Sequence, residues 1–515
     1  MELVGRLHPS RLGGLAAGVA RTAHDRTRLR AGIVHLGLGA FARAHLAAVN
    51  EAALAAGAGE AWGICGVSLR QPDTRDALAP QDGLYTLALR DADEHGEPRQ
   101  RLAVIGCLLE SLVAPEDPRA VLARIAHEDA RIVSITVTEK GYCHDPASGQ
   151  LKLDHPDIVH DLGQPQAPRS AIGYLAWGLQ QRRAAGRGPL TLMSLDNLPA
   201  NGHLLRGMVL AFAEQVDAGL ARWIAAECTF PCSMVDRIVP RTTDADRDAV
   251  ARALGLADAW PVMAEPYLEW VLEDSFAAGR PDWSAGGARF VAGAAPFETL
   301  KLRNVNGAHS ALAYLSVMAG WDTVDQALAQ PALRRYLERL MREEIAPTLP
   351  PLPGLDLAQY QERLLQRFAN PALRHQTRQI AMDGSQKLPQ RLLDTARARL
   401  AREQPMPLLA LAVAGWLHYL RGVDQAGRRY DIQDPMAGAL ARRLEQAEAA
   451  ATLAGPGPAA MLEWTAALAG FAPVFGELGQ DARFVRAVAQ AVHALRSLGV
   501  AGALEALEAL DGSRR

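Results

Sequence analysis

Short β-branched runs alternate with helix-forming segments over the first 200 residues, and this alternation restricts the possible folds more than any other feature of the chain. The runs read as strands because they are apolar, contain valine and isoleucine, and are bounded by glycine, proline or asparagine. They lie at residues 32–40, 62–69, 102–112, 131–143 and 189–202. Strands that alternate with helices predict an α/β fold with a mostly parallel sheet.

The chain changes character near residue 298. Beyond this point, long segments rich in leucine, alanine and arginine show helical spacing, and β-branched runs are few. A stretch rich in glycine and proline, residues 279–297, precedes the change, and such stretches mark turns and linkers. We therefore predict a sheet domain at residues 1–290 and a mostly α-helical domain at residues 291–515.

The composition indicates a soluble, globular protein with a small-molecule partner. Hydrophobic residues make up 49% of the chain and charged residues 22%, as is usual for a globular protein. A formal charge of −3 gives no electrostatic reason to expect nucleic acid or an anionic membrane as partner. The apolar run Leu408–Leu417 is too short for the roughly 20 residues of a membrane span, and a core helix explains it better. We expect a monomer or a small homo-oligomer.

The five cysteines indicate a reducing compartment. They are odd in number, widely spread and contain no C-x-x-C pair, so neither a disulfide framework nor a zinc knuckle is indicated. The first thirty residues do not contain the continuous apolar core of a secretory signal. We therefore expect a cytoplasmic protein.

The sequence HLGLGAFARAH joins the first candidate strand to a helix through Gly37 and Gly39. Glycine lets the backbone turn tightly and approach a pyrophosphate, which the N-terminus of the following helix attracts. The third glycine of Gly-x-Gly-x-x-Gly is missing, since Ala42 stands there after Phe41. A tight turn without a ligand would also explain the motif. Between alternating strands and helices, however, it predicts a Rossmann-type, doubly wound sheet that binds a dinucleotide through Gly37, Gly39 and Phe41.

Asp73 lies about thirty residues beyond the glycine turn, after the second candidate strand. An acidic residue at this place commonly accepts hydrogen bonds from the adenosine ribose, and it would repel the 2′-phosphate of NADP. Arg70 is three residues away and would act in the opposite sense. We predict NAD as the cofactor, with NADP less favoured.

The segment KLRNVNGAHS, Lys301–Ser310, holds the candidate catalytic residues. A lysine acts as a general base only when burial or nearby positive charge lowers its pKa from about 10.4, and Lys301 has leucines on both sides and Arg303 two positions on. Asn306 and His309 are three residues apart and share a helix face, whereas Lys301 lies about 140° from Asn306 at about 100° per residue. We therefore expect Lys301 at or just before the start of a helix.

Two amide side chains that face one alkoxide would stabilise its negative charge as the proton leaves. Asn306 is one candidate. Asn197 is the other, because it follows a predicted strand at the edge where open α/β sheets bind ligands. Each residue also has a simpler interpretation: a lysine in solvent, an asparagine that caps a turn, or a histidine packed in a core. Together they favour removal of a proton from an alcohol.

With these motifs together, the sequence resembles the polyol-specific long-chain dehydrogenases, the family that contains mannitol 2-dehydrogenase and fructuronate reductase (D-mannonate oxidoreductase). The resemblance covers nearly the whole chain. The matching segments occur in family order: IVHLGLGAFARAH, WGICGVSLR, TVTEKGYC, DNLPANG, FPCSMVDRIVP, VLEDSFAAGRPDW, KLRNVNGAHS and IAMDGSQKLPQRLLD.

The resemblance implies an N-terminal Rossmann-type domain that binds a nicotinamide dinucleotide, a mostly helical C-terminal domain, and an active site in the cleft between them. It implies catalysis without a metal, with the base in a Lys-x4-Asn-x2-His motif that falls on Lys301, Asn306 and His309. Asn197 and Asn306 then polarise the reacting oxygen, and His309 orients the substrate. Lys301 takes the hydroxyl proton of a secondary alcohol in an open-chain sugar derivative, and the hydride passes to the nicotinamide; reduction reverses these steps.

Asp236 and Glu298 also fall on family positions, and the resemblance implies that they position the substrate or relay protons. A salt bridge with neighbouring arginines is an alternative role for Asp236. Ala308 is a departure, because relatives carry serine in Asn-Gly-Ser-His, and this removes one hydroxyl from the site.

The substrate is either a neutral polyol or a sugar acid, which differ by one carboxylate. The segments TEKGYC and LRHQTRQIAMDGSQKLPQRLLD resemble the fructuronate reductase branch. Cationic side chains that suit a carboxylate lie in or near the motifs: Arg303, Arg374, Arg378 and Lys387. We expect interconversion of D-mannonate and D-fructuronate, with Arg378 and Lys387 at the substrate. Interconversion of D-mannitol and D-fructose, or of another polyol, is the alternative.

Two hypotheses from other classes stay open. One is a catalytically silent relative that binds a dinucleotide or a sugar, which loss of Lys301, Asn306 or His309 would have supported; all three are present. The other is a Rossmann protein that transfers a methyl group, which would not need a lysine set between two amides.

Overall fold

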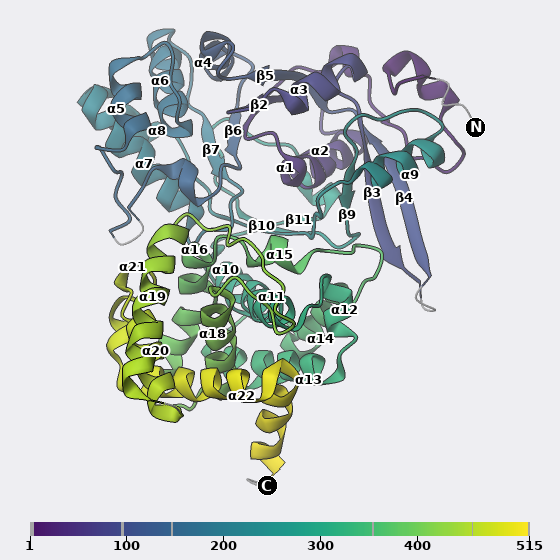
Figure 1. Cartoon of the computed structure of the whole chain (residues 1–515). Coiled ribbons are helices and arrows are strands. Elements are labelled where there is room, and N and C mark those ends of the chain that lie inside the picture. Colours follow the sequence, from purple (N-terminus) through teal and green to yellow (C-terminus); the bar gives the residue numbers. More distant parts are fainter. Residues whose placement is uncertain (1–4, 94–96, 146–147, 353–354, 456, 513–515) are drawn as a thin grey trace. The chain divides into compact units, whose positions relative to one another are not determined.

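The computed structural model describes residues 5–93, 97–145, 148–352, 355–455 and 457–512. It divides into two compact units, Met1–Glu298 and Thr299–Arg515, which run from purple to teal and from teal to yellow in Figure 1. The domain boundary that we predict between residues 290 and 291 stays a proposal.

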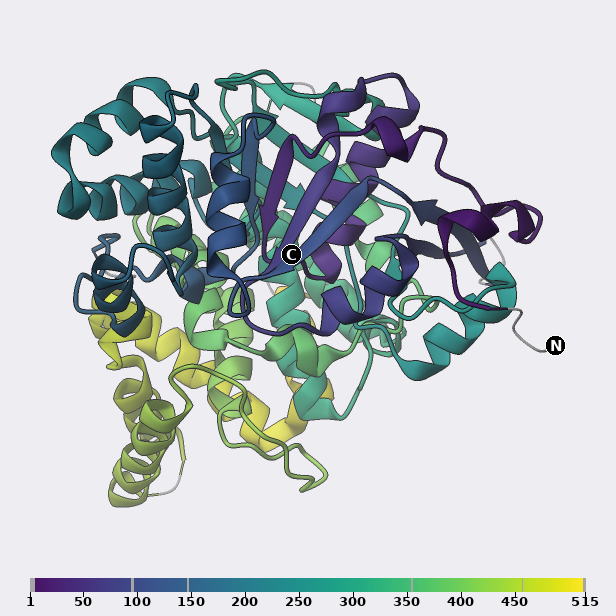
Figure 2. The ribbon, with the colours of Figure 1, turned by 90° about the horizontal axis from the view of Figure 1, so that it is seen from above.

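The first unit is built on a parallel sheet. Its strands are β1 Ile33–Leu36, β2 Ile64–Ser68, β3 Tyr85–Ala92, β4 Pro98–Ile105, β5 Leu108–Val113, β6 Ile132–Ile135, β7 Thr191–Ser194, β8 Ser233–Asp236, β9 Val262–Ala264, β10 Glu269–Glu273 and β11 Ala288–Val291. The main sheet has the order β5-β2-β1-β6-β7 with every pair parallel, and its purple and blue arrows lie side by side in Figure 2. The unit also contains two three-stranded sheets, with the orders β11-β10-β8 and β4-β3-β9. The prediction of a Rossmann-type parallel sheet is confirmed.

Helices cover both faces of the main sheet. Those of the first unit are α1 Ala40–Ala44, α2 Leu46–Ala55, α3 Asp73–Leu78, α4 Pro118–Ala126, α5 Pro156–Gly163, α6 Ala171–Ala184, α7 Asn201–Val216, α8 Ala218–Glu227 and α9 Asp244–Leu254, and α10, Ala295–Leu300, crosses into the second unit. Alternate residues of a strand face opposite sides. Val34 and Leu36 accordingly pack with α4, α6 and α7, and Ile33 packs on the other face with α2.

Two predicted strands are shorter or more divided than expected. Residues 131–143 form a strand only over Ile132–Ile135, because the N–H groups of Val137 and Thr138 bond the Asp196 carboxylate instead of a neighbouring strand. Residues 102–112 belong to β4 and β5, which lie in different sheets.

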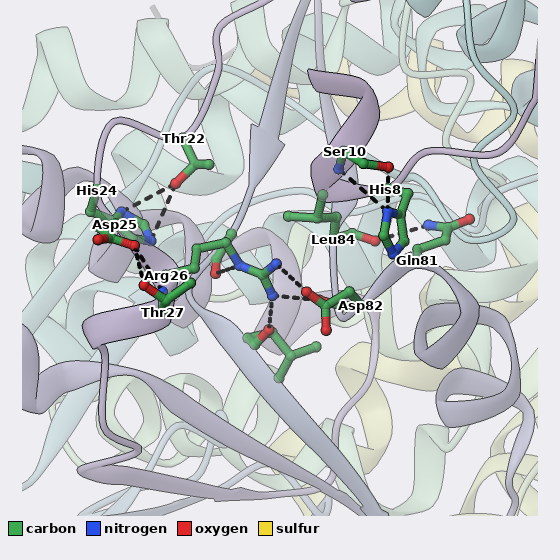
Figure 3. A network of polar contacts seen from close by, with 12 residues as sticks. His8, Ser10, Thr22, His24, Asp25, Arg26, Thr27, Gln81, Asp82 and Leu84 are labelled. Atoms are coloured by element: carbon green, nitrogen blue, oxygen red, sulfur yellow. Dashed lines mark hydrogen bonds and ion pairs between the residues drawn. The ribbon is translucent and has the colours of Figure 1, made fainter. Parts of the chain in front are cut away.

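Arg26 fastens the segment ahead of β1 to the first unit. Its guanidinium donates to the carbonyl oxygens of Gly106 (2.8 Å) and Leu108 (3.2 Å) and pairs with the Asp82 carboxylate at 2.8 Å, as Figure 3 shows. A planar guanidinium can serve several acceptors at once. The N-terminal segment is thereby joined to the connection between β4 and β5.

The second unit is mostly α-helical over its described residues, as predicted. Its α-helices are α11 Gly307–Ala319, α12 Val324–Leu328, α13 Pro331–Arg339, α14 Leu357–Phe368, α15 Thr377–Ala381, α16 Gly384–Leu388, α17 Asp394–Leu400, α18 Pro407–Tyr419, α19 Ala437–Ala454, α20 Pro458–Ala469, α21 Ala472–Phe475 and α22 Ala482–Gly512. Three π-helical segments interrupt the series, Lys301–Asn306, Leu340–Ile345 and Pro389–Leu393. The apolar run Leu408–Leu417 lies in α18, which is buried and packs against α11.

The helix at the end of the chain is long and apolar. By length and composition alone Ala482–Ala509 could cross a membrane, and so could the bent pair of Pro458–Ala469 and Ala472–Gln480. Of the apolar window in Ala482–Ala509, 39% is buried within the structure. Core helices of globular domains have the same composition, so this property is weak evidence for a membrane span.

A buried histidine makes the stability of the second unit depend on pH. His418 is 6% exposed, and its Nε2 lies 3.2 Å from the Arg421 guanidinium, which can only donate. Burial, together with the charges of Arg421 and Arg496, lowers the pKa of His418 to about 4. The unfolded histidine has a pKa near 6.5. Protons therefore favour the unfolded chain below pH 6.5, and the stability present above that pH is lost toward pH 4.

We expect the midpoint of thermal unfolding to depend less on pH in His418→Gln than in the wild type. Glutamine can accept the bond from Arg421 but does not titrate, so the variant escapes a loss of about 2 kcal/mol at pH 5. Calorimetry at pH 8 and pH 5 measures the change, each protein serving as its own baseline. An equal decrease in both proteins would contradict this role of His418.

Candidate active site

The backbone turns between β1 and α1 at Gly37, whose φ of 97° favours glycine. A Cβ atom at this position would lie 2.1 Å from the carbonyl oxygen of Thr136, so a larger residue cannot be accommodated. At Gly39, the N-cap of α1, a Cβ would meet only the carbonyl oxygen of Gly37, at 3.8 Å. The turn thus leaves open space above bare backbone, next to the first N–H groups of α1.

His35 ties this turn to β6. Its Nδ1 is 2.8 Å from Oγ of Ser134, and its Nε2 is 3.0 Å from Oγ1 of Thr136 and 3.2 Å from the carbonyl oxygen of Gly37. Burial lowers the pKa of His35 to about 4. At neutral pH the ring is therefore uncharged, with one nitrogen that donates and one that accepts.

A cavity of about 310 Å³ lies at this edge of the sheet. Gly37 and Gly39 line it, together with residues that follow β2 and β6 and residues at the start of α6. Its charged lining residues are Arg70, Lys140, Asp157 and Arg169. Three cations against one carboxylate suit an anionic ligand, and the glycine backbone suits a pyrophosphate.

Two of the predicted cofactor residues are not in the lining of this cavity. Phe41 stacks on His45 with ring centres 5.2 Å apart. Asp73 is the first residue of α3 and is exposed, whereas Arg70 lines the cavity. The parts of Phe41 and Asp73 in cofactor binding stay predictions.

Asn197 lies in the loop after β7, which Asp196 anchors. The Asp196 carboxylate accepts hydrogen bonds from the N–H groups of Val137 (3.1 Å) and Thr138 (3.0 Å) and from the Tyr142 hydroxyl (2.9 Å). Burial raises the pKa of Asp196 to about 6, against these three hydrogen bonds. The loop that carries Asn197 is thus fixed to the end of β6.

Asn201 organises the same loop, and the sequence analysis does not single it out. It is fully buried, and its Nδ2 donates to the carbonyl oxygens of Ser194 (3.3 Å), Asp196 (2.9 Å) and Ser233 (2.8 Å). Its Oδ1 accepts from the N–H of Ser233 at 2.9 Å. One side chain therefore joins the ends of β7 and β8 to the start of α7. In the sequence it is only the second asparagine of DNLPANG.

Asp236 and Glu298 are both buried in the first unit. Asp236 ends β8 and is 7% exposed. Glu298 is 6% exposed, and its Oε2 accepts from the N–H of Ala200 at 2.9 Å. Burial raises the pKa of Glu298 to about 7; the Ala200 bond opposes this shift and the charge of Glu273 adds to it. A carboxyl group with this pKa can exchange protons near neutral pH.

Lys301 lies inside a continuous helical run and not at its start, so our expectation on this point is wrong. Helical backbone runs from Ala295 through α10, the π-helical segment Lys301–Asn306 and α11. Hydrogen bonds in a π-helix run between residues i and i+5, so one turn takes about one residue more than in an α-helix. Asn306 therefore lies close to one turn beyond Lys301, whereas α-helical geometry would separate them by about 140°. Short π segments are frequent at functional sites.

Several buried polar side-chain atoms of this helix have no hydrogen-bond partner in the part of the chain that the structure describes. They include Nδ2 of Asn306 and Nε2 of His309, and also Nδ2 of Asn304 and the hydroxyl groups of Tyr314 and Ser316. Buried polar atoms are normally hydrogen-bonded. Asn306 and His309 are three residues apart and so lie on one face of the helix, and an amide N–H suits an alcohol or an alkoxide.

Cationic side chains surround His309. Its ring stacks on Phe368 with centres 4.5 Å apart and meets His375 edge-on at 5.3 Å. Burial lowers the pKa of His309 well below its ordinary value, and further lowering comes from His375, Arg391, Arg367 and Lys301. Burial lowers the pKa of His375 to about 4, and Lys387 adds to that effect. This part of the helical unit thus holds neutral histidines among lysines and arginines.

The two cations that we predict at the substrate, Lys387 and Arg378, have different surroundings. Nζ of Lys387 donates to the carbonyl oxygen of Ile380 at 3.4 Å, and its charge acts on His375. Arg378 is exposed and lies over the Tyr430 ring at 5.5 Å. The roles of all the predicted site residues stay proposals, and Arg367, Arg391 and His375 are cluster members that the sequence analysis missed or did not assign.

Two family models match this chain. The mannitol dehydrogenase Rossmann domain matches residues 31–285, and the mannitol dehydrogenase C-terminal domain matches residues 294–496. The chain is 45% identical to D-mannonate oxidoreductase of Escherichia coli over 478 residues, which cover 92% of this chain and 95% of that protein. It is 41% identical to mannitol 2-dehydrogenase of Phaeosphaeria nodorum over 429 residues, 82% of this chain and 74% of that protein.

A solved structure is similar over both units. The ternary complex of Pseudomonas fluorescens mannitol 2-dehydrogenase with NAD and D-mannitol matches with a TM-score of 0.89 and 37% identity. The match covers 98% of this chain and 99% of that one. The similarity therefore extends to the helical half as well as to the sheet.

We expect Asn201→Ala to lower the free energy of unfolding by about 1–3 kcal/mol, because buried carbonyl and N–H groups lose their partner. Thermal unfolding measures this loss. Arg206→Ala is the matched control, since Arg206 is exposed on the same helix, and it should change stability by less than about 0.5 kcal/mol. Equal stability of the two variants would show that Asn201 does not hold the loop.

Proposed function

The chain belongs to the mannitol dehydrogenase family, and from this membership we propose that it interconverts D-mannonate and D-fructuronate with NAD as cofactor. Members of the family are oxidoreductases that act on polyols or sugar acids, and this chain is an oxidoreductase of the family. We further propose a cytoplasmic enzyme, in agreement with five cysteines that are all free.

The positive charge around His309 and His375 is the observation that favours a sugar acid over a neutral polyol as substrate. Four cations act on these two rings: Lys301, Arg367, Lys387 and Arg391. Both histidines are held neutral, so the local charge comes from lysine and arginine alone. A substrate carboxylate would balance that charge, and arginine can bind it through two parallel hydrogen bonds. The similarity to D-mannonate oxidoreductase supports the same choice.

We propose that Lys301 is the general base. Its place at the start of the π segment, one turn before Asn306, supports a joint action on one hydroxyl group. Nδ2 of Asn306 would donate to the oxygen as it loses its proton, and Nε2 of His309 would orient the neighbouring part of the substrate. For Asn197 we propose the second amide of the pair, and for Asp236 and Glu298 a part in positioning or proton transfer.

The glycine turn fits a dinucleotide. Gly37 has no room for a side chain and Gly39 has open space above it, as backbone that approaches a pyrophosphate requires. The bound nicotinamide would supply the hydride acceptor or donor. We propose NAD over NADP because of Asp73, although Arg70 in the cavity lining reduces that preference.

Interconversion of D-mannitol and D-fructose is the second candidate. The matches to mannitol 2-dehydrogenases favour it, including the complex with NAD and D-mannitol. The two candidates differ in whether the cations of the helical unit meet a carboxylate or a hydroxyl group.

We expect purified protein to oxidise NADH with D-fructuronate at a kcat/KM at least about tenfold higher than with D-fructose, since one buried charge pair is worth more than about 1.4 kcal/mol. Absorbance at the NADH band measures both rates, with NADPH as the cofactor control. A preference for D-fructose would replace the proposed substrate by the polyol. Oxidation with neither sugar would reject both candidates.

We expect Lys301→Ala to lower turnover by about 10²–10⁴-fold or more, because it removes the proposed general base. NADH binding, measured by fluorescence titration, should stay at the wild-type level. Lys152→Ala is the control, because Lys152 is exposed on the first unit and should leave both quantities unchanged. A Lys301→Ala enzyme with more than about a tenth of the wild-type rate would exclude Lys301 as the base.

A further inference from the structure

Three side chains of different chemistry meet at the start of α7, away from the glycine turn. They are His203 on α7, Cys232 just before β8, and Glu273 at the end of β10. One ligand atom from each, a ring nitrogen, a sulfur and a carboxylate oxygen, lies within 4.8 Å of the other two. Nothing in the proposed reaction uses this cluster.

The backbone brings His203 and Cys232 together. A Cβ at Gly202 would lie 2.4 Å from the carbonyl oxygen of Phe230 and 2.6 Å from that of Pro231, so the start of α7 can approach the segment before β8 only because residue 202 is glycine. The backbone of Gly202 and His203 acts on the Cys232 thiol and lowers its pKa, against the larger effect of burial. Backbone donors of this kind at a helix N-terminus stabilise negative charge on sulfur.

The carboxylate of the cluster is fixed in place. Oε2 of Glu273 accepts from the N–H of Cys232 at 2.9 Å, and Oε1 accepts from the N–H of Ala294 at 3.2 Å. Each oxygen keeps a further lone pair for a cation. Backbone hydrogen bonds therefore hold the Glu273 carboxylate in position before any ion binds.

A second carboxylate makes this place more negative. The charge of Glu298 acts on the Cys232 thiol, as does that of Glu273. Glu298 is 94% buried, since its exposure is 6%, and its Oε1 has no hydrogen-bond partner among the described residues. The Glu298 carboxylate therefore adds to the charge around the cluster, while the three candidate ligand atoms come from His203, Cys232 and Glu273.

We propose that His203, Cys232 and Glu273 bind a Zn²⁺ ion. Zinc accepts this mixture of sulfur, nitrogen and oxygen ligands, at about 2.3 Å for sulfur and about 2.0–2.2 Å for the others. Ligands of a tetrahedral ion are roughly 3.5 Å apart, which exposed His203 can reach by rotating its side chain. The ion joins α7, β8 and β10, and it takes the place of the thiol proton.

The other cluster of similar composition is less suitable. Cys143, His155 and Asp157 also lie within reach of one ion, but Nδ1 of His155 accepts from the N–H of Asp157 at 3.2 Å and caps α5. Cys143 and Asp157 belong to the lining of the cavity at the glycine turn. This second cluster serves as the internal comparison for the test.

The test uses Co²⁺ as a spectroscopic substitute for Zn²⁺ on the full chain after treatment with a chelator. We expect one equivalent of Co²⁺ to produce the near-ultraviolet charge-transfer band of a cobalt thiolate, and Zn²⁺ to displace it. The band should disappear in Cys232→Ser. It should persist in Cys228→Ser, a cysteine that is equally buried and whose thiol pKa burial also raises to about 11, and in Cys143→Ser.

His203→Ala provides a second variant, since His203 is exposed and its loss should leave the fold intact. It should weaken Zn²⁺ affinity by at least about tenfold, as even outer partners of a metal site are worth 10–100-fold. It should also abolish the rise in unfolding midpoint that Zn²⁺ gives the wild type. The proposal is rejected if no band forms, if the band survives in Cys232→Ser, if it disappears in Cys143→Ser, or if His203→Ala binds Zn²⁺ like the wild type.

Discussion

The close approach of Gly37 to Thr136 is the contact on which the sheet unit depends. With only 2.1 Å between a Cβ at Gly37 and the Thr136 carbonyl oxygen, β1 and β6 can end side by side only if this residue is glycine. Their alignment lets the His35 ring form hydrogen bonds with Gly37 after β1 and with Ser134 and Thr136 at the end of β6. It also opens the backbone surface that lines the cavity. The loop after β7 is fixed to the end of β6, because the Asp196 carboxylate accepts hydrogen bonds from the N–H groups of Val137 and Thr138.

In the helical unit, a local change of helix geometry determines how the candidate catalytic side chains are placed. The π-helical segment Lys301–Asn306 lengthens one turn and rotates the residues on either side of it relative to one another. Without it, Lys301 and Asn306 would face different directions from one helix. Hydrogen bonds of a π-helix are less favourable than those of an α-helix, so such a segment persists where the surrounding packing supports it. Here Leu302 and Val305 within the segment and Leu300 just before it are all buried.

The sequence was a good guide to the elements and a poor one to their exceptions. Alternating β-branched runs predict the parallel sheet, and Gly37 and Gly39 mark its turn, because both signals are local. The strand at residues 131–143 ends early because Asp196, distant in sequence, takes the N–H groups of Val137 and Thr138. The error at Lys301 has a different cause: periodicity assumes about 100° per residue, and a π segment breaks that assumption. Asn197 and Asn201 look alike in DNLPANG, and only burial distinguishes the loop anchor from its neighbour.

The arrangement of charge in the helical unit also determines where selectivity would arise. His309 and His375 are neutral, so they can donate and accept hydrogen bonds without adding to the repulsion among the four surrounding cations. A carboxylate distant from the reacting carbon relieves that repulsion equally in the bound substrate and in the transition state. Such uniform binding lowers KM and leaves kcat nearly unchanged. In the proposed mechanism, Lys301 and Asn306 of the π segment act on the reacting oxygen itself, whose charge changes during the reaction, so their effect would fall on kcat. In that mechanism, Arg367, Lys387 and Arg391 therefore act mainly on the choice of substrate, whereas Lys301 and Asn306 act on the rate of reaction.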